Sequence, residues 1–79
     1  MTATITKIEK RTSIKTAQTV YMVCFKCEDG KSRVSWIDAG FRNFKNWDGL
    51  LEEGNTLENL TVTEKGLIDA DSKPRLVQQ

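Results

Sequence analysis

Histidine is absent from this sequence, proline occurs once, and the longest apolar run, Val20–Phe25, is short. The chain therefore lacks the commonest general base and the commonest neutral metal ligand. Crossing a bilayer takes roughly 20 apolar residues, and the first residues lack an apolar stretch of signal-peptide length. We therefore expect a cytosolic protein that neither spans a membrane nor acts as an enzyme.

Cysteine occurs only as Cys24 and Cys27, which have the C-x-x-C spacing of many metal and redox sites. A structural zinc ion needs four ligands, and the sequence offers neither a second cysteine pair nor a histidine. Both cysteines lie in residues 19–27, a segment rich in strand-forming residues, so their side chains are expected on opposite faces of a strand. We therefore expect structural cysteines and no cofactor, with a zinc ion shared across a dimer as the alternative.

Charge is divided unevenly along the 79 residues, although the net charge is only +1. Residues 1–45 hold nine Lys or Arg and four Asp or Glu, a net charge of +5. Residues 46–79 hold three Lys or Arg and seven Asp or Glu, a net charge of −4. A domain with opposite poles can attract a polyanion at one face and stay nearly neutral overall. The alternative is that both sets only solvate their own surfaces.

Residue patterns predict a single domain, 1–79, with the order strand, strand, strand, short helix, strand, strand. Ile5 and Ile8 are three residues apart, so a bulge is needed to place both on the core side. Asp29-Gly30 predicts a hairpin turn, and Gly66 predicts another. The predicted strands are about 3–11, 19–27, 32–38, 56–63 and 67–71, and the predicted helix, from an apolar stripe at helical spacing, is about 41–51.

This order of elements resembles an OB-fold, and residues 59–75 (Asn-Leu-Thr-Val-Thr-Glu-Lys-Gly-Leu-Ile-Asp-Ala-Asp-Ser-Lys-Pro-Arg) resemble the closing hairpin of nucleic-acid-binding OB domains. The resemblance implies an all-β protein with one short helix, a five-stranded Greek-key OB-fold barrel. An SH3-like barrel is the competing architecture, but it normally lacks a helical turn between strands three and four. Bacterial single-strand binding proteins carry a long acidic tail that this sequence does not show; its size fits a minimal binder such as a phage or plasmid encodes.

An OB-fold binds its ligand on the face of strands two and three and on two flanking loops. Single-stranded nucleic acid requires aromatic rings on which bases stack and cations along the phosphates, and this part of the sequence mixes both. The resemblance thus implies a site made of Lys15, Tyr21, Lys26, Lys31, Arg33, Trp36, Phe41, Arg42 and Lys65. The implied ligand is single-stranded DNA, or RNA, bound with little sequence specificity.

Strand alternation leaves open which face of residues 19–27 is buried. Tyr21, Val23, Phe25 and Cys27 share one face, and Val20, Met22, Cys24 and Lys26 share the other. If the Tyr21 face forms the core, base stacking falls to Trp36 and Phe41.

Partners other than nucleic acid are also expected. A protein-interaction module, such as an inhibitor or an assembly subunit using the same strand face, is the second candidate function. One OB domain covers few nucleotides, so we expect a homodimer or higher oligomer, with residues 19–27 and the C-terminal strand as candidate edges. The acidic residues near the end of the predicted helix either solvate the surface or contact a protein partner, for example in replication or recombination.

Overall fold

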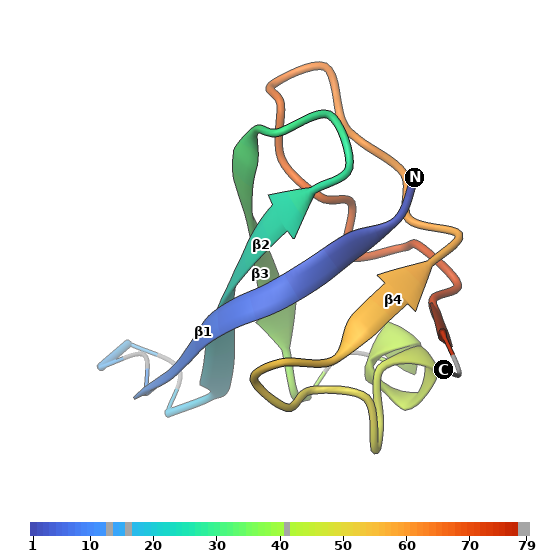
Figure 1. The fold of residues 1–79 in the computed structure, drawn as a ribbon. Helices are drawn as coiled ribbons and strands as arrows, with labels where there is room; N and C mark the ends of the chain where they lie inside the picture. Colours follow the sequence, from blue (N-terminus) through green and yellow to red (C-terminus); the bar gives the residue numbers. More distant parts are fainter. Residues whose placement is uncertain (13, 16, 41, 78–79) are drawn as a thin grey trace.

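Five antiparallel strands form a single sheet in the computed structural model, which describes residues 1–12, 14–15, 17–40 and 42–77 (Figure 1). The strands are β1 (Ala3–Thr12), β2 (Thr19–Cys27), β3 (Ser32–Asp38), β4 (Thr56–Glu58) and β5 (Arg75–Leu76), and the only helical element among the described residues is the short 3₁₀ helix η1 (Arg42–Asn46). Their order across the sheet is β3-β2-β1-β4-β5. The expected all-β class is therefore confirmed.

The predicted bulge in β1 is confirmed and decides which side chains face outward. Ile5 lies opposite Phe25 and Lys7 lies opposite Cys24, so Thr6 is an extra residue in β1. The extra residue returns Ile8 to the side of Ile5, where it packs against the core. It also places every second residue after it, beginning with Lys7, on the solvent side of the sheet.

The hairpin between β2 and β3 is formed at the predicted Asp29-Gly30 turn. Gly30 has a φ of +83°, a conformation that favours glycine, and its N–H donates to Cys27 O at 2.9 Å. The Cys27 N–H donates to Lys31 O at 2.8 Å, which closes the turn. This turn aligns β2 with β3 so that Met22 lies beside Trp36.

The core lies between the inner face of the sheet and the segments that follow β3. Trp47 is fully buried, and its ring lies 6.4 Å from that of Phe25. Its Nε1 donates to Ala70 O at 2.9 Å, so the polar atom of this large ring has a partner. The buried apolar residues are Ala3, Ile5, Val23, Phe25, Cys27, Ile37, Trp47, Leu57, Leu60 and Ile68. The Tyr21 face of β2, left open by the sequence, is therefore the core face.

The predicted helix over 41–51 is wrong in type and length. Within residues 42–51, which the structure describes, only η1 forms, and a turn follows it in which Trp47 N–H bonds to Phe44 O and Leu50 N–H bonds to Trp47 O. These are bonds to the third residue back, as in a 3₁₀ helix, which also places residues at a spacing of three on one side. Gly49 then takes a left-handed φ of +78°, which ends any helical path before Leu51.

The two predicted strands after the helix are also corrected. The strand predicted at 56–63 ends at Glu58, because Asn59 adopts a left-handed φ of +65°. The segment predicted as a strand at 67–71 keeps only one bridge, between Val62 and Ile68, across the predicted Gly66 turn. The fifth strand is instead Arg75–Leu76, which pairs with β4.

Of the two segments expected as edges of the sheet, residues 19–27 are not at an edge. β2 is internal, between β1 and β3, so residues 19–27 offer no edge for dimerisation, and that prediction is wrong. The sheet is not closed into a barrel. The hairpin that contains residues 61–69 reaches β3 through one backbone hydrogen bond, from Ile68 N to Val34 O at 3.1 Å. None of the helical segments in the described ranges has the length and apolar character needed to cross a bilayer.

Candidate functional site

The solvent-facing side of β1, β2 and β3, which we call the outer face, carries the residues that best fit a ligand site. Its members follow from the strand register: Thr4, Lys7, Glu9, Arg11, Val20, Met22, Cys24, Lys26, Ser32, Val34, Trp36 and Asp38. They form rows that cross the three strands, such as Glu9–Met22–Trp36 and Lys7–Cys24–Val34. The outer face therefore combines aromatic, aliphatic and charged side chains.

Trp36 is the exposed aromatic ring of this face. Its exposed fraction is 47%, a high value for a residue in a sheet. The guanidinium carbon of Arg11 lies 5.8 Å from the centre of the ring, within the range of a cation–π contact. The ring is therefore oriented by a cation and still presents surface to solvent.

Glu9 lies between two cations on β1. Lys7 Nζ is 2.9 Å from Glu9 Oε1, and Arg11 Nη2 is 2.9 Å from Glu9 Oε2. The hydrogen bond from Arg11, followed by that from Lys7, lowers the pKa of Glu9 to about 2. Glu9 is accordingly ionised at neutral pH, so this trio carries a net charge of +1.

Apolar side chains share the outer face with Trp36 and the cations of β1. Met22, Cys24 and Val34 are each half-buried although they face outward. Together they form an apolar surface next to the Trp36 ring. An apolar surface next to an aromatic ring and bordered by cations suits the face of a nucleobase and its phosphate.

Further cations extend the outer face toward the hairpin. Lys26 is exposed at the end of β2 and its Nζ donates to Gly30 O at 2.8 Å. Lys31, in the same hairpin, is also exposed. Lys15 is exposed in the loop between β1 and β2, at the opposite end of these strands. The predicted cations thus lie at both ends of the outer face.

Arg33, another predicted site residue, faces the other side of the sheet and is committed to structural contacts. Its Nη1 donates to Gly66 O at 3.1 Å and its Nη2 to Asp29 Oδ2 at 3.0 Å, with only 15% of the side chain exposed. It therefore connects the β2–β3 turn to the turn that contains Lys65. Lys65 itself is exposed.

Tyr21, the other predicted aromatic of β2, is half-buried on the core side. Its ring stacks on that of Phe44, with centroids 5.8 Å apart and an angle of 14° between the planes. This contact assigns Tyr21 to packing against the segment that follows β3. Phe41 lies outside the described residues, and only the backbone of Arg42 is described, at the start of η1.

The cysteines lie on opposite faces of β2, as their spacing predicts. Both are free thiols, and burial raises the pKa of Cys27, which keeps that thiol protonated at neutral pH. Within the described ranges, no three His, Cys, Asp or Glu side chains gather in a way that would hold a metal ion.

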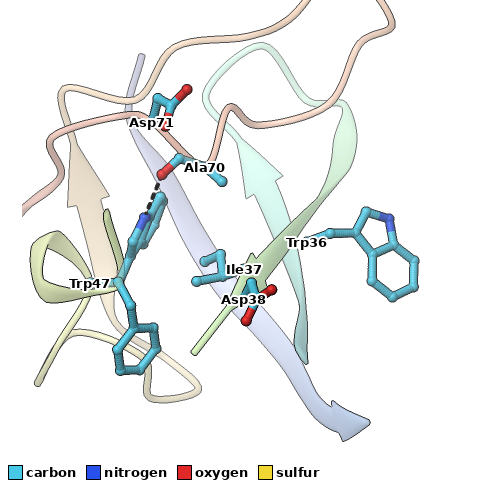
Figure 2. Close-up of a pocket in the computed structure, with 7 residues that line it drawn as sticks. Trp36, Ile37, Asp38, Trp47, Ala70 and Asp71 are labelled. Atoms are coloured by element: carbon cyan, nitrogen blue, oxygen red, sulfur yellow. Dashed lines mark hydrogen bonds between the residues drawn. The ribbon is translucent and has the colours of Figure 1, made fainter. Parts of the chain in front are cut away.

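A cavity of about 310 Å³ opens beside β3, on the core side of the sheet. It is lined by Trp36, Ile37, Asp38, Phe44, Trp47, Ala70 and Asp71. Figure 2 shows that the Trp36 ring points away from Trp47 and Ile37, although Trp36 is one of the residues at the rim of the cavity. A smaller cavity of about 200 Å³ lies next to Tyr21, beyond Phe44 and Trp47.

Two residues of the outer face, Lys7 and Arg11, were not predicted as site residues. Both could have been predicted from the bulge between Ile5 and Ile8. The bulge shifts the outward-facing positions of β1 to residues 7, 9 and 11. The contact between Arg11 and Trp36 follows only from the pairing of both strands with β2.

Neither protein-family models, curated protein sequences nor solved structures yield a match to this chain.

Proposed function

We propose that this domain binds single-stranded nucleic acid on its outer face, with DNA as the first ligand to test and RNA as the second. The binding mode is stacking of a base on Trp36 with phosphates held by nearby cations. The observation that carries the proposal is the half-exposed Trp36 ring, held by Arg11 beside an outward apolar surface. One stacked base contributes roughly 1 to 3 kcal/mol.

The fold that we propose is an open form of the Greek-key OB barrel. Two features support it. The order β3-β2-β1-β4 is that of a Greek key, in which the fourth strand returns beside the first. The hydrogen bond from Ile68 to Val34 brings the hairpin of residues 61–69 against β3, where closure of the barrel would occur. OB-folds bind oligonucleotides on the face of strands two and three, which here includes Trp36 and Lys26.

The arrangement of cations indicates the path of the strand. From Val20 to Lys26 the outer face extends for roughly 20 Å along β2, which accommodates a few nucleotides. Arg11 and Lys15 lie at one end, Lys7 in the middle, and Lys26 and Lys31 at the other end. Contacts to rings and phosphates are possible for any base, so little sequence preference is expected.

Affinity is expected to be modest for a single domain. Glu9 offsets part of the positive charge of Lys7 and Arg11, and only one aromatic ring on the outer face is exposed among the described residues. Two free cysteines agree with a reducing compartment, so we propose the cytoplasm as the place of action. A role in DNA replication or recombination, with a protein partner from such a system, remains part of this proposal.

Tryptophan fluorescence tests the binding directly. Trp47 is fully buried and Trp36 is half-exposed, so oligo-dT should quench mainly Trp36. Quenching should weaken as salt rises, because bound phosphates release counterions. Trp36→Phe keeps an aromatic ring for stacking and removes the fluorescent signal; the remaining Trp47 emission should then be insensitive to oligo-dT.

Charge variants provide the matched control. Lys26→Ala should weaken binding and reduce the salt dependence, whereas Lys73→Ala removes an exposed cation away from the outer face and should leave both unchanged. Absence of salt-dependent quenching at tens of micromolar oligo-dT and oligo-rU would reject the proposal. The protein-interaction module would then be the better function, and the cavity beside β3 would be its first candidate surface.

A further inference from the structure

We propose that this chain forms a two-fold dimer in which Ile14 of each copy enters the cavity beside β3 of the other copy. The proposal concerns the free protein and does not depend on nucleic acid.

Ile14 is the most exposed large apolar side chain of the described residues. Its exposed fraction is 102%, so it is not packed against any of the residues that the structure describes. The other exposed large apolar residues are Trp36, which Arg11 contacts, and Leu76, which belongs to β5. An isoleucine projecting fully into water is costly, and burying it against a partner recovers that cost.

The cavity beside β3 has the size and lining to accept this side chain. Its walls include Ile37, Phe44, Trp47 and Ala70, and its volume of about 310 Å³ exceeds that of a single isoleucine side chain. Figure 2 shows the space between Trp47 and the end of β3, with Ile37 directed into it. The room beyond one isoleucine can take the aliphatic part of the lysine that follows it.

Charge favours the same pairing. Lys15 follows Ile14, and Lys10 and Arg11 precede it, whereas the acidic residues Asp38 and Asp71 are among those that border the cavity. Asp38 Oδ1 accepts a hydrogen bond from Gly40 N at 2.8 Å, and a carboxylate has capacity for further donors on its second oxygen. A lysine ammonium entering beside Ile14 can therefore pair with Asp38.

The positions of the loop and the cavity favour a closed dimer over a chain of copies. Ala39 N donates to Thr19 O at 3.0 Å, and Asp38 pairs with Val20, so the cavity and the β1–β2 loop lie at the same end of the sheet. When two copies meet at this end of the sheet, the β1–β2 loop of each can enter the cavity of the other. Such a contact is self-complementary and has two-fold symmetry.

Sedimentation velocity of the full chain, from about 10 µM to about 1 mM and without nucleic acid, measures this association. The wild type should shift from monomer toward dimer over this range. Ile14→Ser should raise the dissociation constant at least about tenfold, since each dimer loses two buried isoleucines. Leu76→Ser, which removes another exposed large apolar side chain, should leave the dissociation constant unchanged. A wild type that stays monomeric at about 1 mM, or an Ile14→Ser dimer as tight as the wild type, overturns the proposal.

Mixing two variants distinguishes loop-into-cavity contacts from loop-to-loop contacts. Ala70→Phe fills the cavity and leaves the loop intact, whereas Ile14→Ser leaves the cavity intact. Each variant alone should be monomeric, and the mixture should form a one-to-one dimer with one intact contact. Failure of the mixture to associate, with both variants folded by near-UV circular dichroism, would overturn the proposed contact.

A charge exchange tests the same contact without changing the apolar lining, and so serves if Ala70→Phe does not fold. Lys15→Glu and Asp38→Lys should each weaken the dimer, and the double variant should recover it. A double variant no tighter than the weaker single variant would contradict the pairing of Lys15 with Asp38.

Discussion

The guanidinium of Arg11 on β1 lies 5.8 Å from the centre of the Trp36 ring on β3, across the intervening strand β2. Arg11 also pairs with Glu9, which in turn pairs with Lys7. A phosphate that approaches Trp36 therefore meets two cations and one carboxylate. The balance among these charges determines how strongly the outer face binds a polyanion.

Replacing the exposed ring should weaken binding without unfolding the protein. Trp36→Ala should raise the dissociation constant for oligo-dT about 5- to 150-fold, the equivalent of roughly 1 to 3 kcal/mol for one stacked base. Because Trp36 is half-exposed, the free energy of unfolding should change little. Fluorescence anisotropy of a labelled oligo-dT measures the affinity, and urea unfolding followed by circular dichroism is the control. Unchanged affinity would contradict the stacking role.

Removing the carboxylate between the two cations should strengthen binding. Glu9→Gln keeps the shape of the side chain and frees Lys7 and Arg11 to contact phosphates. We expect tighter binding of oligo-dT and a steeper dependence of the binding constant on salt. A titration at two or more salt concentrations measures both quantities. Weaker binding would mean that Glu9 is needed to orient Arg11 over the ring.

Acid should destabilise the fold through carboxylates whose pKa is lowered in the folded state. The pKa of Glu9 falls from 4.5 to about 2, and the Lys31 N–H followed by Arg33 lowers the pKa of Asp29. A pKa lowered by folding contributes stability above the unfolded value, and this stability is lost as pH falls through the folded value. Urea midpoints should therefore decrease from about pH 5 downward. Glu9→Gln should show a shallower decrease, and high salt should reduce the difference because the pair is exposed.

Arg33 should matter for stability more than for binding. Arg33→Ala removes the hydrogen bonds to Gly66 and Asp29 that connect two turns. A loss of about 1 to 3 kcal/mol is expected for a largely buried, charged donor, with a fall in melting temperature of several degrees. Thermal unfolding measures the stability. Weaker oligo-dT binding by a variant that remains as stable as the wild type would place Arg33 in the interface instead.

Trp47→Phe tests the attachment of the segment around Ala70 to the core. The change removes the hydrogen bond from Nε1 to Ala70 O and enlarges the cavities that Trp47 lines. We expect destabilisation of about 2 kcal/mol from the lost bond and the added void. Urea unfolding gives the value. Affinity for oligo-dT should not change, because Trp47 is fully buried in the core and contributes nothing to the solvent-facing surface that would bind the oligonucleotide.

Local patterns predicted the first half of the fold well. The bulge of β1, the Asp29-Gly30 turn and the bounds of β2 and β3 depend on contacts between neighbouring strands and on turn chemistry, both of which are visible in the sequence. The second half was predicted less well. The apolar stripe that ends in Leu51 predicts an α-helix, but a 3₁₀ helix followed by turns has a similar spacing. The left-handed φ angles of Gly49 and Asn59 end the helical segment and β4 earlier than predicted.

For the candidate site, the amino-acid sequence is enough to establish that cations and aromatic residues occur together in residues 1–45, and that each strand has two distinct faces. Which of the two faces is buried depends on how the whole chain packs. Packing of Phe44 on Tyr21 and of Trp47 on Phe25 buried the inner face, on which Arg33 bonds to Gly66 and Asp29, and left Trp36 and Lys26 outside. Alternation creates two faces with equal local geometry, and burial of one depends on residues far away in the chain.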